Sequence, residues 1–201
     1  ASFFWQYFFR GLFGGDIKPF PVPAILDGRI DLFGIDLLKV RVVVFAVSII
    51  ALVLLYLFVM KTKTGKAIRA VAEDKDVATL MGIDVDRTIA TTFAVGAAMA
   101  GIAAILWVLV FKQANFFMGF VPGIKAFTAA VLGGIGSIPG AALGGLFLGL
   151  IEAVGPPLFL EGLGIPGAHQ LKDVTAFTLL VLVLIFRPQG IIGERLAEKK
   201  A

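Results

Sequence analysis

The sequence predicts an all-α polytopic membrane protein, a helical bundle that carries a broken or re-entrant helix pair and a small extracytoplasmic hairpin. Of its 201 residues, 59% are hydrophobic and only 16% are charged, whereas an ordinary soluble domain is about 45–50% apolar. Two runs without a charged residue, 42–60 and 88–111, are each long enough to cross about 30 Å of hydrocarbon as a helix. A chain with so little polar surface is expected to lie in a lipid bilayer.

Several function classes are excluded by what the sequence lacks. The net charge is +4, but Lys and Arg are scattered at the ends of apolar runs and form no single basic face, so we expect no nucleic acid partner. There is no cysteine, and His169 is the sole histidine. The sequence therefore predicts no disulfide, no Cys nucleophile, no thiolate or imidazole metal cluster and no cofactor.

The sequence also lacks an ATP-binding P-loop, G-x-x-x-x-G-K-[ST], whose backbone amides would cradle phosphates. Its single Gly-Lys pair, Gly65-Lys66, has Met60 in place of the first glycine and Ala67 in place of the hydroxyl residue. No catalytic triad or pair of carboxylates converges in the apolar runs. We therefore expect a protein that is not an enzyme.

The first part of the chain predicts the end of one span followed by an outer loop. Residues 1–13 begin with Ala, lack the basic region and cleavage site of a signal peptide, and place Trp5 among Phe residues as an interfacial aromatic belt. We expect the end of an earlier span, in a C-terminal piece of a longer protein. In the expected outer loop, 14–41, Asp27-Gly28 between short apolar runs predicts a hairpin; an unstructured loop is the alternative.

The two long apolar runs differ in their side chains. Residues 42–60 are bulky all round, and this span is expected to face lipid. Residues 88–111 are rich in Gly and Ala, and Gly96 with Ala100 forms the small-xxx-small pattern that lets helix backbones approach closely in lipid. The second span is therefore expected inside a bundle.

A charged loop, 61–87, separates these spans and holds eleven of the 32 Asp, Glu, Lys and Arg residues. Strong helix formers from Ala67 to Met81 predict a short helix with Gly82 as its left-handed C-terminal cap. Ala67, Val71, Ala78 and Met81 recur at helical spacing and give one narrow apolar face.

A loop helix with such a face, and with nothing of its own to pack on, indicates a partner protein. The alternative is a helix that lies on lipid headgroups. Three acidic residues disfavour that alternative, because anionic lipids attract basic faces: Glu73, Asp74 and Asp76.

Residues 123–157 predict a broken or re-entrant pair. Between Ile124 and Leu132 there is room only for a half-crossing helix, the Gly-rich run 133–140 breaks it, and a second helix is expected over 141–153. Irregular backbone at membrane depth is tolerated where protein or a wet cavity satisfies it, so the pair is expected to line a path. A glycine-bent pair of tightly packed structural helices is the competing interpretation. Four glycines fall on nearly one helical face and predict close packing in either case: Gly140, Gly144, Gly145 and Gly149.

The end of the chain predicts a last span at 174–187 and a cytoplasmic tail at 188–201. If this tail and the charged loop both lie inside, the chain crosses an even number of times between the two outer loops, and the broken pair enters and returns. Ten Lys or Arg fall in the proposed inner segments and seven in the longer outer ones, as the positive-inside rule expects.

Five polar residues are candidates for chemistry in or near the membrane. Glu152 lies in an otherwise apolar run, and an intramembrane carboxylate is a functional candidate by default, although its place near a helix end also fits a solvated interfacial residue. Lys125 is interpreted as an interfacial anchor and His169 as solvated. Thr128 and Ser137 offer hydroxyls either to a polar substrate or to helix carbonyls.

Three segments carry a resemblance to a known family: GKAIRAVAEDKDVATLMGIDVDRTIATTFAVGAAMAGIAA at 65–104, GIKAFTAAVLGGIGSIPGAALGGLFLGLIEA at 123–153 and FRPQGIIG at 186–193. Together they resemble the permease subunit of ABC importers for branched-chain amino acids. The resemblance implies a multi-pass protein of the bacterial inner membrane that moves branched-chain or related amino acids.

The resemblance also implies partners and sites. The implied partners are cytoplasmic ATP-binding subunits, a second permease subunit and an extracytoplasmic solute-binding protein. A coupling helix at 72–82 would dock on the ATPase through Glu73, Asp74, Ala78, Leu80, Met81 and Gly82. The translocation path would be bordered by Phe127, Thr128, Gly133, Gly134, Ser137 and Glu152.

Two other function classes remain open at this point. A secondary transporter or channel subunit would use the same re-entrant segment, but it usually shows ionisable relays deep in its spans, and only Glu152 comes close. A purely structural membrane subunit would need no broken segment.

Overall fold

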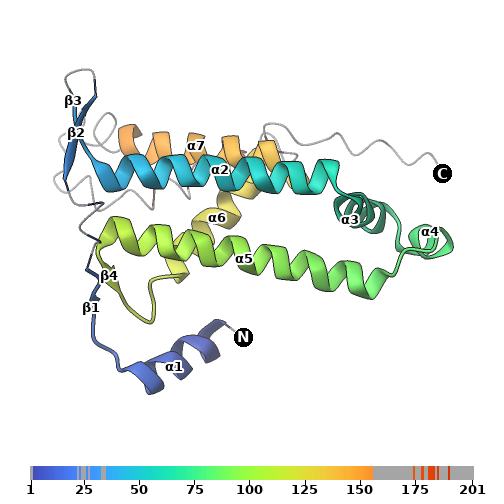
Figure 1. Ribbon diagram of the computed structural model, residues 1–201, viewed down its shortest axis with the longest axis horizontal. Coiled ribbons are helices and arrows are strands. Elements are labelled where there is room, and N and C mark those ends of the chain that lie inside the picture. Colours follow the sequence, from blue (N-terminus) through green and yellow to red (C-terminus); the bar gives the residue numbers. More distant parts are fainter. Residues whose placement is uncertain are drawn as a thin grey trace. The chain divides into compact units, whose positions relative to one another are not determined.

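The computed structural model describes residues 2–21, 23, 26, 28–32, 35–155, 174, 178, 181–183, 185 and 190. The chain divides by its contacts into two units, 1–118 and 119–201, and each is described by itself. The first unit contains α1 (Ser2–Phe13), β1 (Lys18–Pro19), β2 (Arg29–Leu32), β3 (Ile35–Leu38), α2 (Lys39–Lys61), α3 (Lys63–Glu73), α4 (Lys75–Leu80), α5 (Val85–Phe111) and β4 (Gln113–Ala114) (Figure 1). The second contains α6 (Phe120–Gly133) and α7 (Ile138–Gly155).

The described residues agree with a polytopic helical membrane protein. Three helices, α2, α5 and α7, are long and apolar enough to cross a membrane, and α6 is a shorter apolar helix. His169, the tail 188–201 except Gly190, and most of the expected last span at 174–187 lie outside the described residues.

The strands of the first unit form two small antiparallel pairs. β2 pairs with β3, from Arg29 opposite Leu38 to Leu32 opposite Ile35. Both strands of this pair come after Gly28, so the hairpin predicted in this loop does not have Asp27-Gly28 as its turn. Gly28 instead accepts a hydrogen bond from the Lys39 N–H at the start of α2, 3.1 Å away. The second pair joins β1 to β4, so two segments far apart in sequence meet beside the end of α5.

Helices α2 and α5 run side by side in opposite directions (Figure 1). α2 contains the whole expected span 42–60 and extends it at both ends. Its bulky side chains are exposed or half-buried, and only Val40 is buried. The predicted interior place of the Gly- and Ala-rich α5 is not seen among the described residues, since Gly96, Ala100 and Gly101 are exposed.

α3 folds back over the end of α2. The Thr62 hydroxyl donates to the Phe58 carbonyl at 2.6 Å and accepts from the Gly65 N–H at 3.0 Å, which caps the first turn of α3. Gly65 is buried, and a Cβ there would collide with the carbonyl oxygens of Phe58 and Val59. Only glycine allows this approach of the two helices.

Helices α6 and α7 form an antiparallel hairpin around a short break at Gly134–Ser137. The break is shorter than the predicted run 133–140, because α7 already begins at Ile138. Ser137 explains the difference: its hydroxyl accepts a hydrogen bond from the Gly140 N–H at 3.1 Å. The intervening Pro139 sits in the first turn, where its missing N–H costs no helical hydrogen bond.

Glycines bring the backbones of α6 and α7 into direct contact. A Cβ at Gly133 would collide with the Gly140 carbonyl, and one at Gly144 would collide with the Ala129 carbonyl. Gly140, Gly144 and Leu148 are buried at four-residue spacing. The predicted close packing is confirmed for Gly140 and Gly144. It is not confirmed for Gly149, where a Cβ would meet no atom within 4 Å, or for Gly145, which is exposed.

Candidate functional site

The charged loop contains two helices, and the prediction of one short helix across it is wrong. α3 ends and α4 begins at Asp74, whose backbone is extended at φ −154° and ψ 117°. Its carboxylate accepts hydrogen bonds from the N–H groups of Asp76 at 2.9 Å and Val77 at 3.1 Å. An aspartate side chain that bonds backbone N–H groups in this way favours a new helix start over continuation of the old helix.

Gly82 ends α4, as predicted. Its φ of +80° is left-handed, the Gly82 N–H donates to the Thr79 carbonyl at 2.9 Å, and the Ile83 N–H donates to the Ala78 carbonyl at 3.1 Å. This pair of bonds is the Schellman cap, in which glycine bears the left-handed conformation without steric cost. The chain then enters α5, where the Asp84 carboxylate caps the first turn by accepting from the Arg87 N–H at 3.0 Å.

The apolar side chains of this loop divide into a buried set and an exposed set. Val71 and Ala78 are 6% and 3% exposed, because α3 packs on α2 and α5 and α4 packs on α3 and α5. The premise that the loop has nothing of its own to pack on is therefore wrong. Val77, Leu80 and Met81 are 54%, 87% and 77% exposed, and we call these three residues the α4 apolar surface.

The residues predicted to contact an ATPase are only partly accessible. Glu73, Asp74, Leu80, Met81 and Gly82 are exposed, whereas Ala78 is buried within the chain. Sequence reasoning missed Val77, which is exposed beside Leu80 on the same short helix. The available signal was a large apolar side chain among acidic residues, next to Asp76 and close to Asp74.

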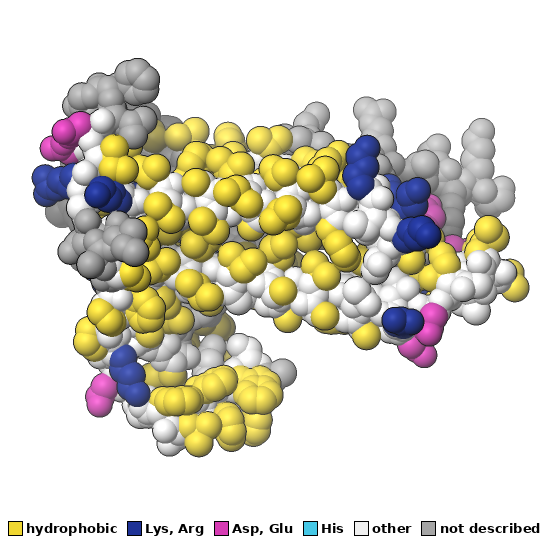
Figure 2. All heavy atoms as spheres, in the orientation of Figure 1, with side chains coloured by type: hydrophobic (Ala, Val, Ile, Leu, Met, Phe, Trp, Pro, Cys, Tyr) yellow, Lys and Arg dark blue, Asp and Glu magenta, His cyan; other side chains and the backbone are white. Residues whose placement is uncertain are grey.

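Charged side chains gather at the two ends of the α2–α5 pair, and hydrophobic side chains cover the length between them (Figure 2). Lys61, Lys63 and Arg87 lie at the end that carries α3 and α4. Arg41 and Lys112 lie at the other end, beside the strands. This distribution is typical of helices with an apolar middle for hydrocarbon and polar ends for the headgroup regions.

The residues predicted to border a path do not share one surface of the α6–α7 hairpin. Thr128 is 1% exposed, and its hydroxyl donates to the Ile124 carbonyl at 2.9 Å, whereas Phe127 is 65% exposed. Gly133 lies in the helix contact, and Gly134 ends α6 at φ +108°. Ser137 caps α7. The hydroxyls of Thr128 and Ser137 thus both form hydrogen bonds within the hairpin. This agrees with the alternative that they serve the backbone and not a polar substrate.

Lys125 and Glu152 form an ion pair that joins α6 to α7. The Lys125 ammonium lies 3.0 Å from Oε1 of Glu152 and donates a hydrogen bond to Oε2 at 3.1 Å. Their side chains are only 23% and 19% exposed, and Oε1 accepts no hydrogen bond of good geometry among the described residues. Two interpretations from the sequence are therefore wrong. Glu152 is not simply a solvated residue near a helix end, and Lys125 is not only an interfacial anchor, because the two side chains pair with each other. Sequence reasoning missed the pair because the residues are 27 positions apart.

Gly190 belongs to the FRPQGIIG segment and lies against the break between α6 and α7. It is buried at φ +77°, and a Cβ there would come 2.5 Å from the Gly134 nitrogen and 2.8 Å from the Val131 carbonyl oxygen. Among the described residues, no group of three or more His, Cys, Asp or Glu is placed to hold a metal ion.

Comparison with known proteins identifies the family. Residues 2–184 match the family of the branched-chain amino acid transport system permease component. The chain is 44% identical over 189 residues to the permease protein BraD of the high-affinity branched-chain amino acid transport system of Pseudomonas aeruginosa, covering 92% of this chain and 59% of that protein. It is 43% identical over 172 residues to the corresponding protein LivH of Escherichia coli K12, covering 86% of this chain and 53% of that protein.

A more distant relative is the autoinducer 2 import system permease protein LsrD of Escherichia coli SMS-3-5, 27% identical over 188 residues, with 90% of this chain and 53% of that protein covered. No solved structure matches. The chain thus spans between about half and three-fifths of the length of these relatives. It belongs to the family of branched-chain amino acid transport system permease components.

Proposed function

We propose that this chain is part of the membrane permease of an ATP-driven ABC importer that moves branched-chain or related amino acids across the bacterial inner membrane. The observation that carries the proposal is the family match over residues 2–184. Two of its relatives, BraD and LivH, are named as high-affinity branched-chain amino acid permeases. ATP hydrolysis would belong to separate cytoplasmic subunits, because this sequence has no P-loop.

The α4 apolar surface is the proposed contact with the ATPase. A short helix that exposes Val77, Leu80 and Met81 beside the exposed acids Glu73 and Asp74 has the apolar centre and polar rim of a protein–protein contact. Gly82 fixes the direction in which the chain leaves this contact. Ala78 is buried, so it would not touch the ATPase but would help to pack α4 against α3 and α5. ATP-driven closure of the ATPase subunits would move α3 and α4, and with them α2 and α5, as a rigid body.

This assignment sets the expected topology. The charged loop 61–87 and the tail 188–201 would be cytoplasmic, and the β2–β3 hairpin would be extracytoplasmic, where a solute-binding protein delivers the substrate. Spans at 42–60, 88–111 and 174–187 would cross, and the pair at 123–157 would enter and return. Residues 1–13 would end an earlier span. A second permease subunit would complete the bundle and cover the exposed small residues of α5.

The α6–α7 hairpin is proposed to border the translocation path. Its support is the short α6, which at about 1.5 Å per residue is about 21 Å long and too short to cross alone, and the ion pair in an otherwise apolar pair of helices. Of the predicted path residues, the exposed Phe127 and the half-buried Glu152 and Ser137 would face the path. Thr128, Gly133 and Gly134 are buried and would shape the hairpin behind it. The glycine contacts would make this hairpin move as one body.

Uptake measurements test the proposal. The full-length permease, its ATPase and its binding protein would be reconstituted in liposomes, and uptake of labelled L-leucine would be followed with ATP inside. We expect uptake that requires both ATP and the binding protein. Uptake driven by an ion gradient without ATP would instead support a secondary transporter. If the permease and its ATPase assemble fully but no branched-chain amino acid is taken up, the assigned substrate class is wrong.

A further inference from the structure

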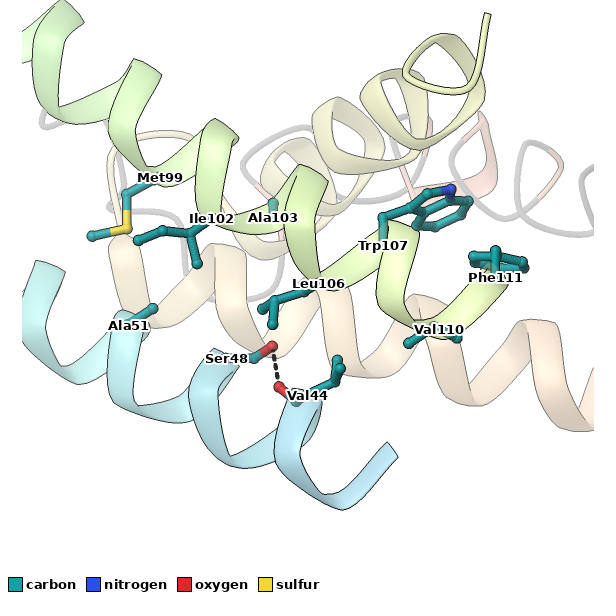
Figure 3. A pocket seen from close by; sticks show the side chains of 10 residues that line it. All are labelled: Val44, Ser48, Ala51, Met99, Ile102, Ala103, Leu106, Trp107, Val110 and Phe111. Carbon is teal, nitrogen blue, oxygen red and sulfur yellow. Dashed lines mark hydrogen bonds between the residues drawn. The ribbon is translucent and has the colours of Figure 1, made fainter. Parts of the chain in front are cut away.

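A groove runs between α2 and α5 in the half of the pair that adjoins the strands. Its volume is about 440 Å³, within the range of about 300–1,000 Å³ common for small-ligand sites. Val44, Ser48 and Ala51 line it from α2, and Met99, Ile102 and Leu106 are among the residues that line it from α5. Figure 3 shows these side chains pointing toward one another across the groove.

The chemistry of this groove suits hydrocarbon. None of the described residues that line it is charged, and the hydroxyl of Ser48 already donates to the Val44 carbonyl at 2.8 Å. An amino acid placed here would lose the hydration of its ammonium and carboxylate groups and find no partner for either, which is strongly unfavourable. The groove is therefore not a site for the transported solute.

Two cations lie near the strand end of the groove. A smaller pocket of about 50 Å³ shares the lining residue Val110 with it and is also lined by Arg41 and Lys112, and none of its described lining residues is acidic. Lys112 caps α5 at φ +56°, the single left-handed residue other than glycine in the described chain. Its N–H donates to the Val108 carbonyl at 2.8 Å and its carbonyl accepts from the Phe20 N–H at 2.9 Å, which fixes the backbone of this lysine at the end of α5.

The length of the groove matches one leaflet. Its lining on α5 runs from Met99 to Phe111, which at 1.5 Å per residue is about 18 Å. Half of a hydrocarbon core is about 15 Å thick. An acyl chain that starts at the cations would therefore extend along the groove toward the bilayer centre.

From these features we infer a binding site for an anionic phospholipid, with its phosphate between Arg41 and Lys112 and one acyl chain in the groove. Charge complementarity with these two cations selects the anionic headgroup, and the apolar lining holds the chain. The site lies wholly within residues 26–112 and needs only that α2 and α5 span a bilayer. It is independent of which solute the transporter carries.

Native mass spectrometry of the purified full-length transporter tests this inference. The complex would be equilibrated with phosphatidylglycerol and phosphatidylcholine that carry identical acyl chains, and the retained lipid would be counted. We expect a preference for phosphatidylglycerol of about tenfold, lost in the double variant Arg41→Gln/Lys112→Gln. The matched control, Lys61→Gln/Arg87→Gln, removes two cations from the other ends of the same helices and should keep the preference.

A second pair of variants separates the acyl-chain site from the headgroup site. Ala51→Leu/Ala103→Leu fills the groove and should lower retention of both lipids, whereas Val53→Leu, an exposed position of α2 outside the lining, should not. Three results would overturn the inference. They are an equal loss of the phosphatidylglycerol preference in the control variant Lys61→Gln/Arg87→Gln, no headgroup preference in the wild type, and unchanged lipid retention when the groove is filled. A photo-crosslinker at Ile102 that captures a protein helix in place of lipid would also overturn it.

Discussion

The two helix pairs of this protein are held together in opposite ways. α6 and α7 touch along their length, because Gly133, Gly140 and Gly144 let carbonyl groups of one helix approach the backbone of the other. α2 and α5 are both more apolar by hydropathy than α7, yet they leave a groove of about 440 Å³ between them. At one end α3 packs on both helices, and near the strands Val40 of α2 and Val108 of α5 are buried.

The difference teaches which sequence property holds helices together in a membrane. Lipid is as apolar as a leucine side chain, so apolarity gives no net drive for two helices to associate there. Small residues that allow close backbone contact, and polar pairs that lipid cannot satisfy, supply it instead. The α6–α7 hairpin has both. α5 does contain small residues, but a Cβ at Gly96 or Gly101 would meet no atom within 4 Å, so they bring no backbone of α2 into close contact.

The largest expected effect comes from breaking the glycine contact. Gly144→Leu would place a side chain against the Ala129 carbonyl and the Gly133 backbone, and we expect a loss of more than about 3 kcal/mol in the free energy of unfolding. Thermal unfolding of the full-length protein in detergent measures it. Gly149→Leu is the control, because Gly149 faces open space; equal losses in the two variants would contradict the packing described above.

The next largest effect comes from the ion pair of the same hairpin. Lys125→Met leaves the half-buried Glu152 carboxylate without its ion-pair partner, and we expect a loss of about 2–3 kcal/mol, below the value for a fully buried pair. Denaturant unfolding in detergent measures it. The charge-swapped variant Lys125→Glu/Glu152→Lys should recover most of the loss, and failure to recover any of it would show that the pair does not join the helices.

A smaller effect is expected where α2 and α5 are tied by the loop helices. Asp74→Ala removes the acceptor for the Asp76 and Val77 N–H groups, and the loss should be about 1 kcal/mol. Amide hydrogen exchange should speed up at Val77 while the α6–α7 hairpin keeps its protection. Asp76→Ala, which removes only a first-turn charge, should cost no more than about 0.3 kcal/mol, and an equal effect from it would contradict the assigned cap.

The smallest effect concerns the strands at the other end of that pair. A hydrogen bond to Asp31, directly opposite on β2, raises the pKa of Asp36, with a smaller contribution from desolvation. A carboxyl group whose pKa is raised on folding binds its proton more tightly when folded, so it stabilises the hairpin at low pH and loses that contribution as pH rises through the raised pKa. Asp31→Asn should lower the pKa of Asp36 in a carboxyl NMR titration. An unchanged titration would show that Asp31 is not the cause.

Local chemistry made part of this structure predictable. The apolar runs gave the long helices because only a helix satisfies its own backbone in lipid, and Gly82 was recognised because a left-handed cap favours glycine. The break at Asp74 was hidden by the good helix formers on either side of it, although Asp is a strong N-cap residue. α7 begins at Ile138, three residues before the predicted 141, because Ser137 caps the helix and leaves Pro139 in its first turn.

Contacts between distant residues were the less predictable part. The burial of Ala78 depends on α4 packing against α3 and α5, and the Lys125–Glu152 pair depends on α6 folding back on α7. The packing of Gly190 against Gly134 joins segments 56 positions apart. A single sequence carries no direct signal for such pairings. The burial of Ala78 and the exposure of Val77 beside the predicted contact residues Leu80 and Met81 therefore emerged only from the structure.

The proposed coupling role of the α4 apolar surface has one most direct measurement. The double variant Leu80→Glu/Met81→Glu places two charges on this surface without changing a buried residue, and the affinity of the full-length permease for its ATPase would be measured by titration in detergent. We expect at least a tenfold loss of affinity, with Thr64→Glu, an exposed position on α3, leaving it unchanged. Undiminished affinity in the double variant would contradict the coupling role.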